Sequence, residues 1–305
     1  MTAQDYTGPA PLGIVHARPD RDDDVTIRSA RLRRWREVAR LSRNRPGFLL
    51  ALAFILFVLV AAIAPAWLTQ FDPYATAPLQ KLKSPSLVHF FGTDELGRDL
   101  YTRVIYGASL SVQAAVLAVA IAFFGGSALG LFAGFFGGRT DSVIMRLIDV
   151  LLALPSLLLA LSIVTAIGFG TIPVAIAVGF GILPGFARTM RAEVLRVKTL
   201  PYVEAARLGG AGWFAVLKNH ILPNASGAVL VLATLDFGVA ILVASGLSFL
   251  GFGAAPPLAE WGTLIANGRK FLMTAPWLSL VPGLFVALAV FSLNHISRTL
   301  EEIWR

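Results

Sequence analysis

Residues 227–250 read GAVLVLATLDFGVAILVASGLSFL, and Asp236 is the only charged residue among them. A helix needs about 20 mostly apolar residues to cross a bilayer, so this run predicts a transmembrane helix. A carboxylate near the middle of such a helix is costly and normally faces a cavity or a partner group. Asp236 therefore has two interpretations: it lines a translocation path, or it forms a buried hydrogen bond to another helix.

Similar apolar runs recur along the chain after residue 46. The 305 residues are 56% hydrophobic and 14% charged, with a mean hydropathy of +0.72, whereas about 25% of residues in a typical soluble domain are charged. Pro155 falls inside the third run and predicts a kink there. We predict an all-α integral membrane protein with six transmembrane helices, at about 47–69, 108–136, 143–167, 171–187, 227–250 and 278–297.

The positions of the basic residues predict the orientation. If the N-terminus is cytoplasmic, the segments on that side hold 20 of the 26 Lys and Arg residues, and the external segments 70–106 and 251–277 hold the other 6. Because cytoplasmic loops of membrane proteins are enriched in Lys and Arg, both termini are predicted to be cytoplasmic. This rule accounts for the net charge of +8 better than nucleic-acid binding does. The cytoplasmic segments are 1–46, 137–146, 187–224 and the C-terminal tail.

The polar tail, residues 1–46, precedes the first span. Its first part is predicted to be disordered, and the acidic run 22–24 is interpreted as solvated rather than metal-binding. Residues 27–43 predict a basic amphipathic helix with Leu32, Trp35 and Ala39 on one face. Such a helix either lies on an anionic membrane surface or is solvated, and both interpretations stay open.

The second predicted span carries glycine at every fourth position, at Gly126, Gly130, Gly134 and Gly138. One helix face then has no side chains, which allows another backbone to approach closely, as in GxxxG packing. The pattern predicts a helix-packing face. It serves either ordinary packing within the chain or a surface that slides during conformational change.

Charged residues lie at the cytoplasmic end of the third span and just before the second span. Arg146 and Asp149 are three residues apart, a spacing that allows them to pair on one helix face. In the external segment 70–106, Asp94 to Arg98 and Asp99 to Arg103 have i,i+4 spacing. We predict two ion pairs on a short helix that Asp94 caps, just before the second span.

The sequence disfavours a membrane enzyme and an ATP-independent transporter. The chain has no cysteine and its histidines are scattered, so no metal site and no cofactor are predicted. It also lacks the GxxxxGK[ST] pattern that binds ATP phosphates. Enzymes need paired carboxylates or metal-ligand spacing at a membrane face, and secondary transporters commonly show internal repeats. Neither feature is found. The four histidines are His16, His89, His220 and His295.

The loop 187–224 is rich in helix formers. Residues 204–208 predict a short helix, and Gly209 and Gly210 end it, because glycine accepts the left-handed conformation. A short helix, a glycine turn and a second helix form a compact protrusion on a membrane domain. That shape suits docking to a soluble partner.

This loop resembles the cytoplasmic loop of permease subunits of ABC importers, which carry Glu-Ala-Ala, a glycine, and Leu-Pro further along. His220 stands where the family often has an apolar residue, and the C-terminal residues 294–297 also depart from its pattern. Four other segments are similar to the "C" permeases of dipeptide and oligopeptide importers, a group that includes nickel and glutathione importers: 91–109, 136–160, 247–257 and 260–269. The matching loop residues are Glu204, Ala205, Ala206, Gly210, Leu222 and Pro223.

The resemblance implies an ABC importer type I permease fold in a bacterial inner membrane, with residues 107–305 as a core permease domain of five spans. It implies a second homologous permease subunit, two cytoplasmic ATPase subunits and an extracytoplasmic solute-binding protein. The chain would form half of a path for di- or oligopeptides, with nickel and glutathione as open alternatives, and would not itself be an enzyme. The residues implied to couple it to an ATPase are Tyr202, Glu204, Ala205, Ala206, Arg207, Gly210, Leu222 and Pro223.

Overall fold

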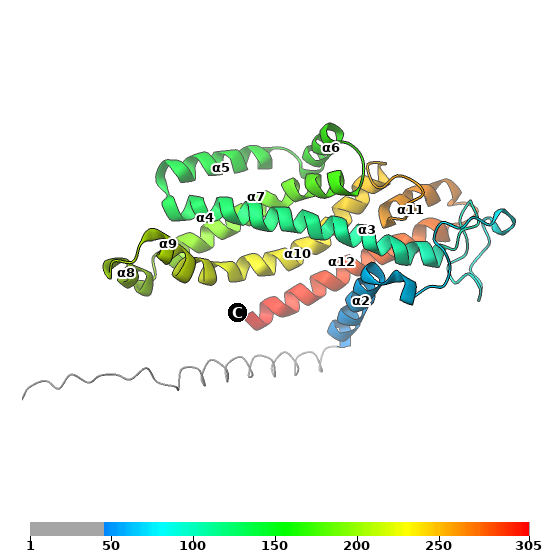
Figure 1. Cartoon of the computed structure of the whole chain (residues 1–305), viewed down its shortest axis with the longest axis horizontal. Helices are drawn as coiled ribbons and strands as arrows, with labels where there is room; N and C mark the ends of the chain where they lie inside the picture. Colours follow the sequence, from blue (N-terminus) through cyan, green and yellow to red (C-terminus); the bar gives the residue numbers. More distant parts are fainter. Residues whose placement is uncertain (1–45, 305) are drawn as a thin grey trace, which may run out of the picture. The chain divides into compact units, whose positions relative to one another are not determined.

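The computed structural model describes residues 46–304, with side chains as far as Thr299, and the predictions for the tail lie outside this range (Figure 1). The described chain is helical and forms no sheet; Thr93 and Asp99 make an isolated bridge. The helices are α2 (Pro46–Ile63), α3 (Leu100–Ile121), α4 (Ser127–Phe136), α5 (Gly138–Ala153), α6 (Ser156–Ile167), α7 (Thr171–Lys198), α8 (Pro201–Leu208), α9 (Trp213–Val216), α10 (Leu222–Phe249), α11 (Trp261–Gly268) and α12 (Trp277–Trp304).

Five continuous helical stretches are long and apolar enough to cross a membrane, and the bent pair α5–α6 makes a sixth if it is counted as one span. On that count the predicted six spans are confirmed. The second stretch joins α3 to α4 through the π-helical turn Ala122–Gly126, and the fourth joins α9 to α10 through a second π-helical turn, Leu217–Ile221. The five stretches are Pro46–Ile63, Leu100–Phe136, Thr171–Lys198, Trp213–Phe249 and Trp277–Thr299.

Pro155 does more than kink the third span. α5 ends at Ala153, α6 begins at Ser156, and the two helices meet at 95°. A proline disfavours helical backbone at the residue before it, and Leu154 is extended, with φ −93° and ψ 137°. The break leaves α5 along one side of α4 and α7, while α6 packs on α7 (Figure 1).

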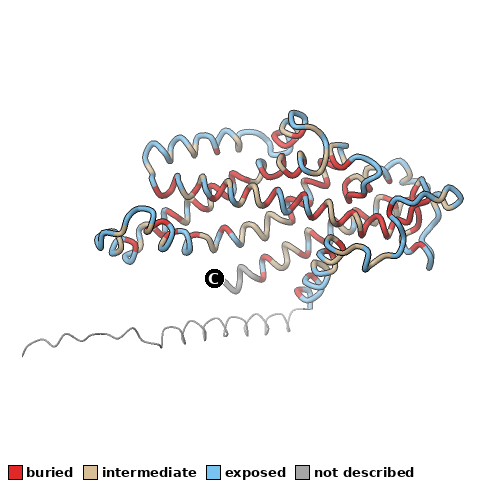
Figure 2. The backbone as a smooth tube through the Cα atoms, viewed as in Figure 1, coloured by how far each residue is buried: buried red, intermediate tan, exposed pale blue. Residues whose placement is uncertain are grey.

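α7 contributes buried residues along its whole length, although its C-terminal half contains several charged residues. Twelve of its 28 residues are buried, in a row from Val174 to Val197, and it packs against α3, α4, α6 and α10. Figure 2 shows buried positions concentrated between these helices, whereas α2, α5 and α8 are largely exposed. The helix continues to Lys198, well past the predicted end at 187, because the buried side chains recur at helical spacing as far as Val197.

The short helix predicted at the end of the segment 70–106 is not formed. Residues 94–98 form a turn, not a short helix. The Oδ1 atom of Asp94 accepts hydrogen bonds from the backbone N–H groups of Leu96 and Arg98, both at 2.9 Å. An Asp side chain bound in this way competes with helix formation. Asp99 is the residue that caps the N-terminus of α3.

Candidate coupling surface and membrane path

The helix–glycine–helix protrusion lies at the end of the helices opposite the external segment and α11 (Figure 1). α8 covers residues 201–208, and the chain turns at Gly210, whose φ is +83°. Non-glycine residues rarely adopt this conformation, so Gly210 is required by the backbone and not by crowding. A Cβ at Gly210 would meet nothing within 4 Å.

The residues of the matched motif are mostly exposed on this protrusion. Glu204 and Ala205 are exposed, Ala206 is half-buried, and Val203 beneath them is fully buried. The Glu204 carboxylate forms no hydrogen bond or ion pair with the side chains that the structure describes. Leu208 is 84% exposed. Tyr202, Arg207, Leu222 and Pro223 are exposed as well.

Phe135, at the end of α4, holds the protrusion to the membrane helices. Its ring is buried and lies 5.9 Å from the Lys198 ammonium and 5.9 Å from the Arg207 guanidinium. Lys198 Nζ also donates a hydrogen bond of 2.7 Å to the Phe135 carbonyl. This carbonyl lies in the last turn of α4, where carbonyl groups have no hydrogen-bond donor within the helix. Trp213 of α9 packs on the same ring, with centroids 6.4 Å apart. We call Phe135, Lys198, Arg207 and Trp213 the Phe135 cluster.

Three of the four predicted packing glycines form a close contact with α7. A Cβ at Gly126 would lie 2.6 Å from the Leu183 carbonyl oxygen, and one at Gly134 would lie 2.9 Å from Val194. At Gly130 it would collide with the Ala187 carbonyl oxygen. Gly138 lies outside this contact: it begins α5, and a Cβ there would meet nothing within 4 Å. We call Gly126, Gly130 and Gly134 the glycine seam.

α5 is attached to α7 by two ion pairs that sequence spacing did not reveal. Arg191 donates two hydrogen bonds to the Asp141 carboxylate, at 2.5 and 2.6 Å. Arg188 donates one of 2.7 Å to Asp149. The predicted pairing of Arg146 with Asp149 is therefore wrong, because Asp149 is turned toward α7.

Asp236 lies about halfway along α10. Its side chain is half-buried, and it has no hydrogen bond or ion pair with the side chains that the structure describes. Two residues earlier, Thr234 accepts a hydrogen bond of 2.7 Å from Ser297 of α12. Asp236 is on a different side of α10 from that contact.

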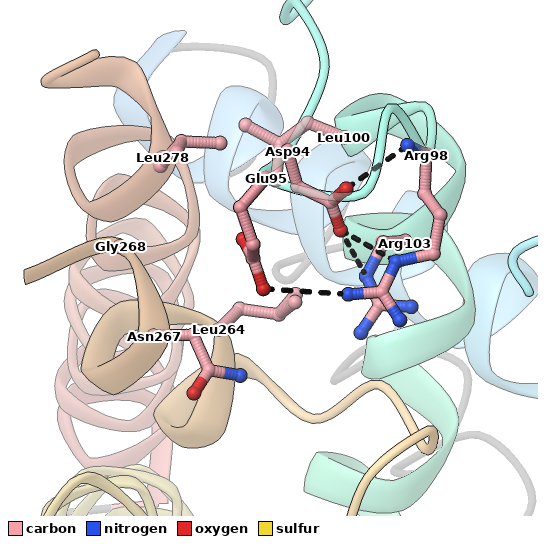
Figure 3. A pocket seen from close by; sticks show the side chains of 9 residues that line it. All are labelled: Asp94, Glu95, Arg98, Leu100, Arg103, Leu264, Asn267, Gly268 and Leu278. Atoms are coloured by element: carbon pink, nitrogen blue, oxygen red, sulfur yellow. Dashed lines mark hydrogen bonds and ion pairs between the residues drawn. The ribbon is translucent and has the colours of Figure 1, made fainter. Parts of the chain in front are cut away.

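A buried polar cluster joins the external segment to α3 (Figure 3). Asp94 Oδ2 accepts a hydrogen bond of 2.6 Å from Arg98 and lies 3.5 Å from Nε of Arg103. The first predicted pair is confirmed, and the second is wrong: Arg103 approaches Asp94, while Asp99 accepts hydrogen bonds from Thr102 and lies 2.9 Å from the His89 ring. Arg103 also donates to the Pro73 carbonyl at 2.9 Å. The Asp94 carboxylate is therefore shared by two buried guanidinium groups, and the Glu95 carboxylate lies 3.7 Å from that of Arg98.

Beside this cluster the structure has a cavity of about 390 Å³, at the end of the helices where the segment 70–106 lies (Figure 1). Its wall includes the loop that follows α10, which Glu260 holds in place by accepting hydrogen bonds from Ser248 (2.8 Å) and from the Ala254 N–H (2.9 Å). Burial raises the pKa of Glu260. The lining residues include Arg98, Phe169, Ala255, Thr263 and Asn267.

The Phe135 cluster and the two ion pairs of α5 are the functional candidates that the sequence did not indicate. The paired residues are far apart in the chain: 39 residues separate Asp149 from Arg188, 50 separate Asp141 from Arg191, and 63 separate Phe135 from Lys198. The basic residue Lys198 at a helix end is a weak signal, since such residues often bind terminal carbonyls. Nothing in the local sequence indicates that Lys198 binds the carbonyl of Phe135.

The comparisons with known proteins decide the family. The family described as "Binding-protein-dependent transport system inner membrane component" matches residues 126–303. The chain belongs to this family. It is thus a multi-pass membrane permease of the ABC importer class, a class that works with ATPase and binding-protein partners.

Relatives of this ABC importer permease include the dipeptide transport system permease protein DppC of Alkalihalophilus pseudofirmus, 39% identical over 88% of each chain. The glutathione transport system permease protein GsiD of Escherichia coli O6:K15:H31 is 38% identical, over 88% of this chain and 89% of that protein. Among solved structures, that of an amino acid ABC transporter with histidines matches with a TM-score of 0.52 at 17% identity. It covers 66% of the permease and 94% of that chain, and it supports the fold alone.

Proposed function

We propose that this permease forms half of the translocation path of a bacterial importer of di- or oligopeptides, and that α8 transmits the action of an ATPase subunit to it. The observation that carries the proposal is the exposed α8 protrusion, at the end opposite the segment 70–106 (Figure 1), whose Glu204 has no partner among the side chains of residues 46–299. Names of relatives favour a peptide substrate, and glutathione, itself a small peptide, is the second candidate.

The contacts around α8 support a rigid connection to the membrane helices. The Phe135 cluster fastens α8 and α9 to α4, and the glycine seam holds α4 against α7. Helices that are in backbone contact along a seam move together, because packed interiors deform little. We expect a displacement of α8 to move α4 and α7 as one body and so to change the access of the path.

Substitution in the α8 turn is expected to uncouple ATP hydrolysis from transport. Gly210→Val places a β-branched residue at φ +83°, and Glu204→Lys reverses an exposed charge, so both change the docking surface without touching the core. Coupling free energies of ~1–3 kcal/mol correspond to ~5–150-fold effects, and losses in this range are expected. The measurement is the ATPase rate of the purified complex with and without peptide-loaded binding protein, together with peptide uptake by proteoliposomes.

Gly212→Ala is the matched control for this experiment. Gly212 lies in the same turn, but its φ is −62° and a Cβ there would meet nothing within 4 Å. The control should keep wild-type stimulation. If both Gly210→Val and Glu204→Lys also keep wild-type stimulation and uptake, α8 is not the coupling element.

The orientation is open to direct labelling, since the chain has no cysteine. Single cysteines at Ser84 and Ala255 are expected to react with an impermeant maleimide added from outside, whereas one at Thr199 should react only after the membrane is opened. All three positions are exposed; the neighbouring Ala254 is buried and would be a poor reporter. Labelling of Thr199 alone in intact cells would reverse the proposed topology.

Asp236→Asn is expected to lower the uptake rate while the subunit content of the complex stays unchanged. The carboxylate at mid-span has no partner within the described chain, so it is proposed to face the water of the path. Uptake and thermal stability are measured on the same preparation. A fall in stability with uptake per folded complex unchanged would favour the alternative of a buried hydrogen bond.

A further inference from the structure

The cavity of about 390 Å³ beside Arg98 and Arg103 has the size of a small-molecule site. Pockets that bind small ligands measure roughly 300–1,000 Å³ and combine apolar walls with a few polar groups. Side chains of both kinds line this cavity. The apolar ones include Phe169 and Leu258, and the polar ones are Glu95, Arg98, Arg103, Ser248, Thr263 and Asn267. The lining therefore suits a small molecule that carries both charged and apolar groups.

The two arginines have hydrogen-bond donors that the described chain does not use. Arg103 is 2% exposed and donates from Nη1 alone, to the carbonyls of Pro73 at 2.9 Å and Pro257 at 3.5 Å. Its buried Nε atom forms no hydrogen bond with the described residues; the nearby Oδ2 atom of Asp94, 3.5 Å away, is bonded to Arg98. A buried donor without an acceptor is costly, so an oxygen atom of a ligand would be bound favourably here.

The charges on this wall of the cavity sum to zero. Figure 3 shows the guanidinium groups of Arg98 and Arg103 next to the carboxylates of Asp94 and Glu95. A ligand with a net charge would unbalance this largely buried group, and uncompensated buried charge is costly. A zwitterion adds one charge of each sign and keeps the balance. The ligand that this wall favours therefore carries both a carboxylate and an ammonium group.

Glu95 is the group on this wall that can receive the ammonium. Its side chain is 33% exposed, and its Oε1 atom lies 3.7 Å from Nη2 of Arg98, beyond hydrogen-bond distance. Asp94, in contrast, is buried and accepts hydrogen bonds from the Arg98 side chain and from two backbone N–H groups. A ligand ammonium can therefore bind Glu95 without breaking a hydrogen bond of the protein.

The rest of the lining suits the remaining parts of a short peptide. The Asn267 side chain lines the cavity, is exposed and forms no hydrogen bond within the described part of the chain. A primary amide both donates and accepts, so it can pair with the N–H or the C=O of a peptide bond. Phe169 and Leu258, which are 69% and 44% exposed, offer apolar surface to ligand side chains.

We propose that this cavity is a binding site for a short zwitterionic peptide, whose C-terminal carboxylate binds Arg98 and Arg103 and whose N-terminal ammonium binds Glu95. The inference rests on the proposed function, because that function supplies peptide to this end of the permease. The site would recognise the two free ends of the peptide, which peptides of different sequence share.

The test is protection of a single cysteine in the complete complex, since the chain has no cysteine of its own. Ala255 lines the cavity and is exposed, whereas Ser84 is exposed and does not line it. The Ala255→Cys and Ser84→Cys complexes are placed in lipid nanodiscs without binding protein or ATP. The rate at which a maleimide labels this chain is followed by mass spectrometry. Alanyl-alanine should slow the labelling of Ala255→Cys severalfold and leave that of Ser84→Cys unchanged.

Blocked peptides test the two charged contacts separately. N-acetyl-alanyl-alanine lacks the ammonium group, and alanyl-alanine amide lacks the carboxylate. Each should need a concentration about tenfold or more higher for the same protection, because hydrogen bonds to charged groups contribute at least that much to binding. No protection by alanyl-alanine, equal slowing at Ser84→Cys, or equal protection by the blocked peptides would overturn the proposal.

Glu95→Gln tests the ammonium contact without removing a buried charge. In the Ala255→Cys background this variant should be protected equally by alanyl-alanine and by its N-acetyl derivative, an effect that a merely structural role of Glu95 would not produce. Asp72→Asn is the matched control, because Asp72 is an exposed carboxylate of the same segment that does not line the cavity. It should keep the preference for the free ammonium. An unchanged preference in Glu95→Gln would overturn the assignment of Glu95.

Uptake by the wild-type complex separates this inference from the function on which it rests. ATP-driven peptide uptake by a complex whose Ala255→Cys variant is not protected would remove the site and leave the proposed function standing. A wild-type complex that takes up no peptide in the presence of binding protein and ATP would remove the proposed function, even if alanyl-alanine protects the cavity.

Discussion

Gly130→Leu is expected to prevent formation of a stable, assembled permease. A Cβ at this position collides with the carbonyl oxygen of Ala187 and lies 3.0 Å from the backbone nitrogen of Arg191. Backbone atoms of α7 cannot rotate away as a side chain would, so α4 and α7 must separate. Overpacking of ordinary cores costs ~1–3 kcal/mol and occasionally more, and this position is expected to exceed that range.

The measurement is the thermal midpoint of the detergent-solubilised complex, followed by size-exclusion chromatography. Gly185→Ala is the matched control, because Gly185 also lies within a membrane helix but a Cβ there would meet nothing within 4 Å. It should be neutral or slightly stabilising, since alanine favours helix over glycine by up to ~1 kcal/mol. A Gly130→Leu complex with a wild-type midpoint would show that the two helices do not depend on the glycine seam.

Asp94→Ala is expected to loosen the external segment from the membrane helices. The substitution leaves Arg98 and Arg103, which are 6% and 2% exposed, without their shared carboxylate. Removal of one partner from a buried ion pair typically costs ~3–5 kcal/mol, because the remaining charge is left uncompensated. Limited proteolysis between residues 70 and 99 should become faster, and the thermal midpoint should fall.

Glu95→Gln is the control for this experiment. Glu95 is a third exposed and lies 3.7 Å from Arg98, so the loss of its charge should cost less than ~1 kcal/mol. A wild-type rate of proteolysis in the Asp94→Ala variant would mean that the arginines find other partners, such as the Pro73 carbonyl that Arg103 already contacts.

The two variants probe opposite ends of the permease. The glycine seam connects α4 to α7 near the end where α8 lies, whereas the Asp94 cluster lies beside the cavity at the other end (Figure 1). Because a side chain at position 130 forces α4 and α7 apart, we expect Gly130→Leu to abolish assembly altogether. Asp94→Ala complexes that do assemble should retain ATPase subunits and be impaired in their response to the external binding protein.

The sequence alone determined the membrane class, the number of spans and the short helix with its glycine turn. Each of these depends on local properties, namely the length of an apolar run and the left-handed turn at Gly210. At Pro155 the sequence predicted a kink, and the structure has a break between two helices at 95°. Spacing also predicted the Asp94–Arg98 pair, because four residues separate the two in the chain.

The tertiary structure alone decided which groups meet across helices. It placed Asp149 against Arg188 instead of Arg146, Arg103 against Asp94 instead of Asp99, and the Phe135 carbonyl against Lys198. It also separated Gly138 from the other three glycines, because the chain turns after Phe136 and the four-residue spacing no longer describes one helix face. Such contacts depend on how helices pack, and packing is set by the whole set of buried side chains, which no local pattern contains.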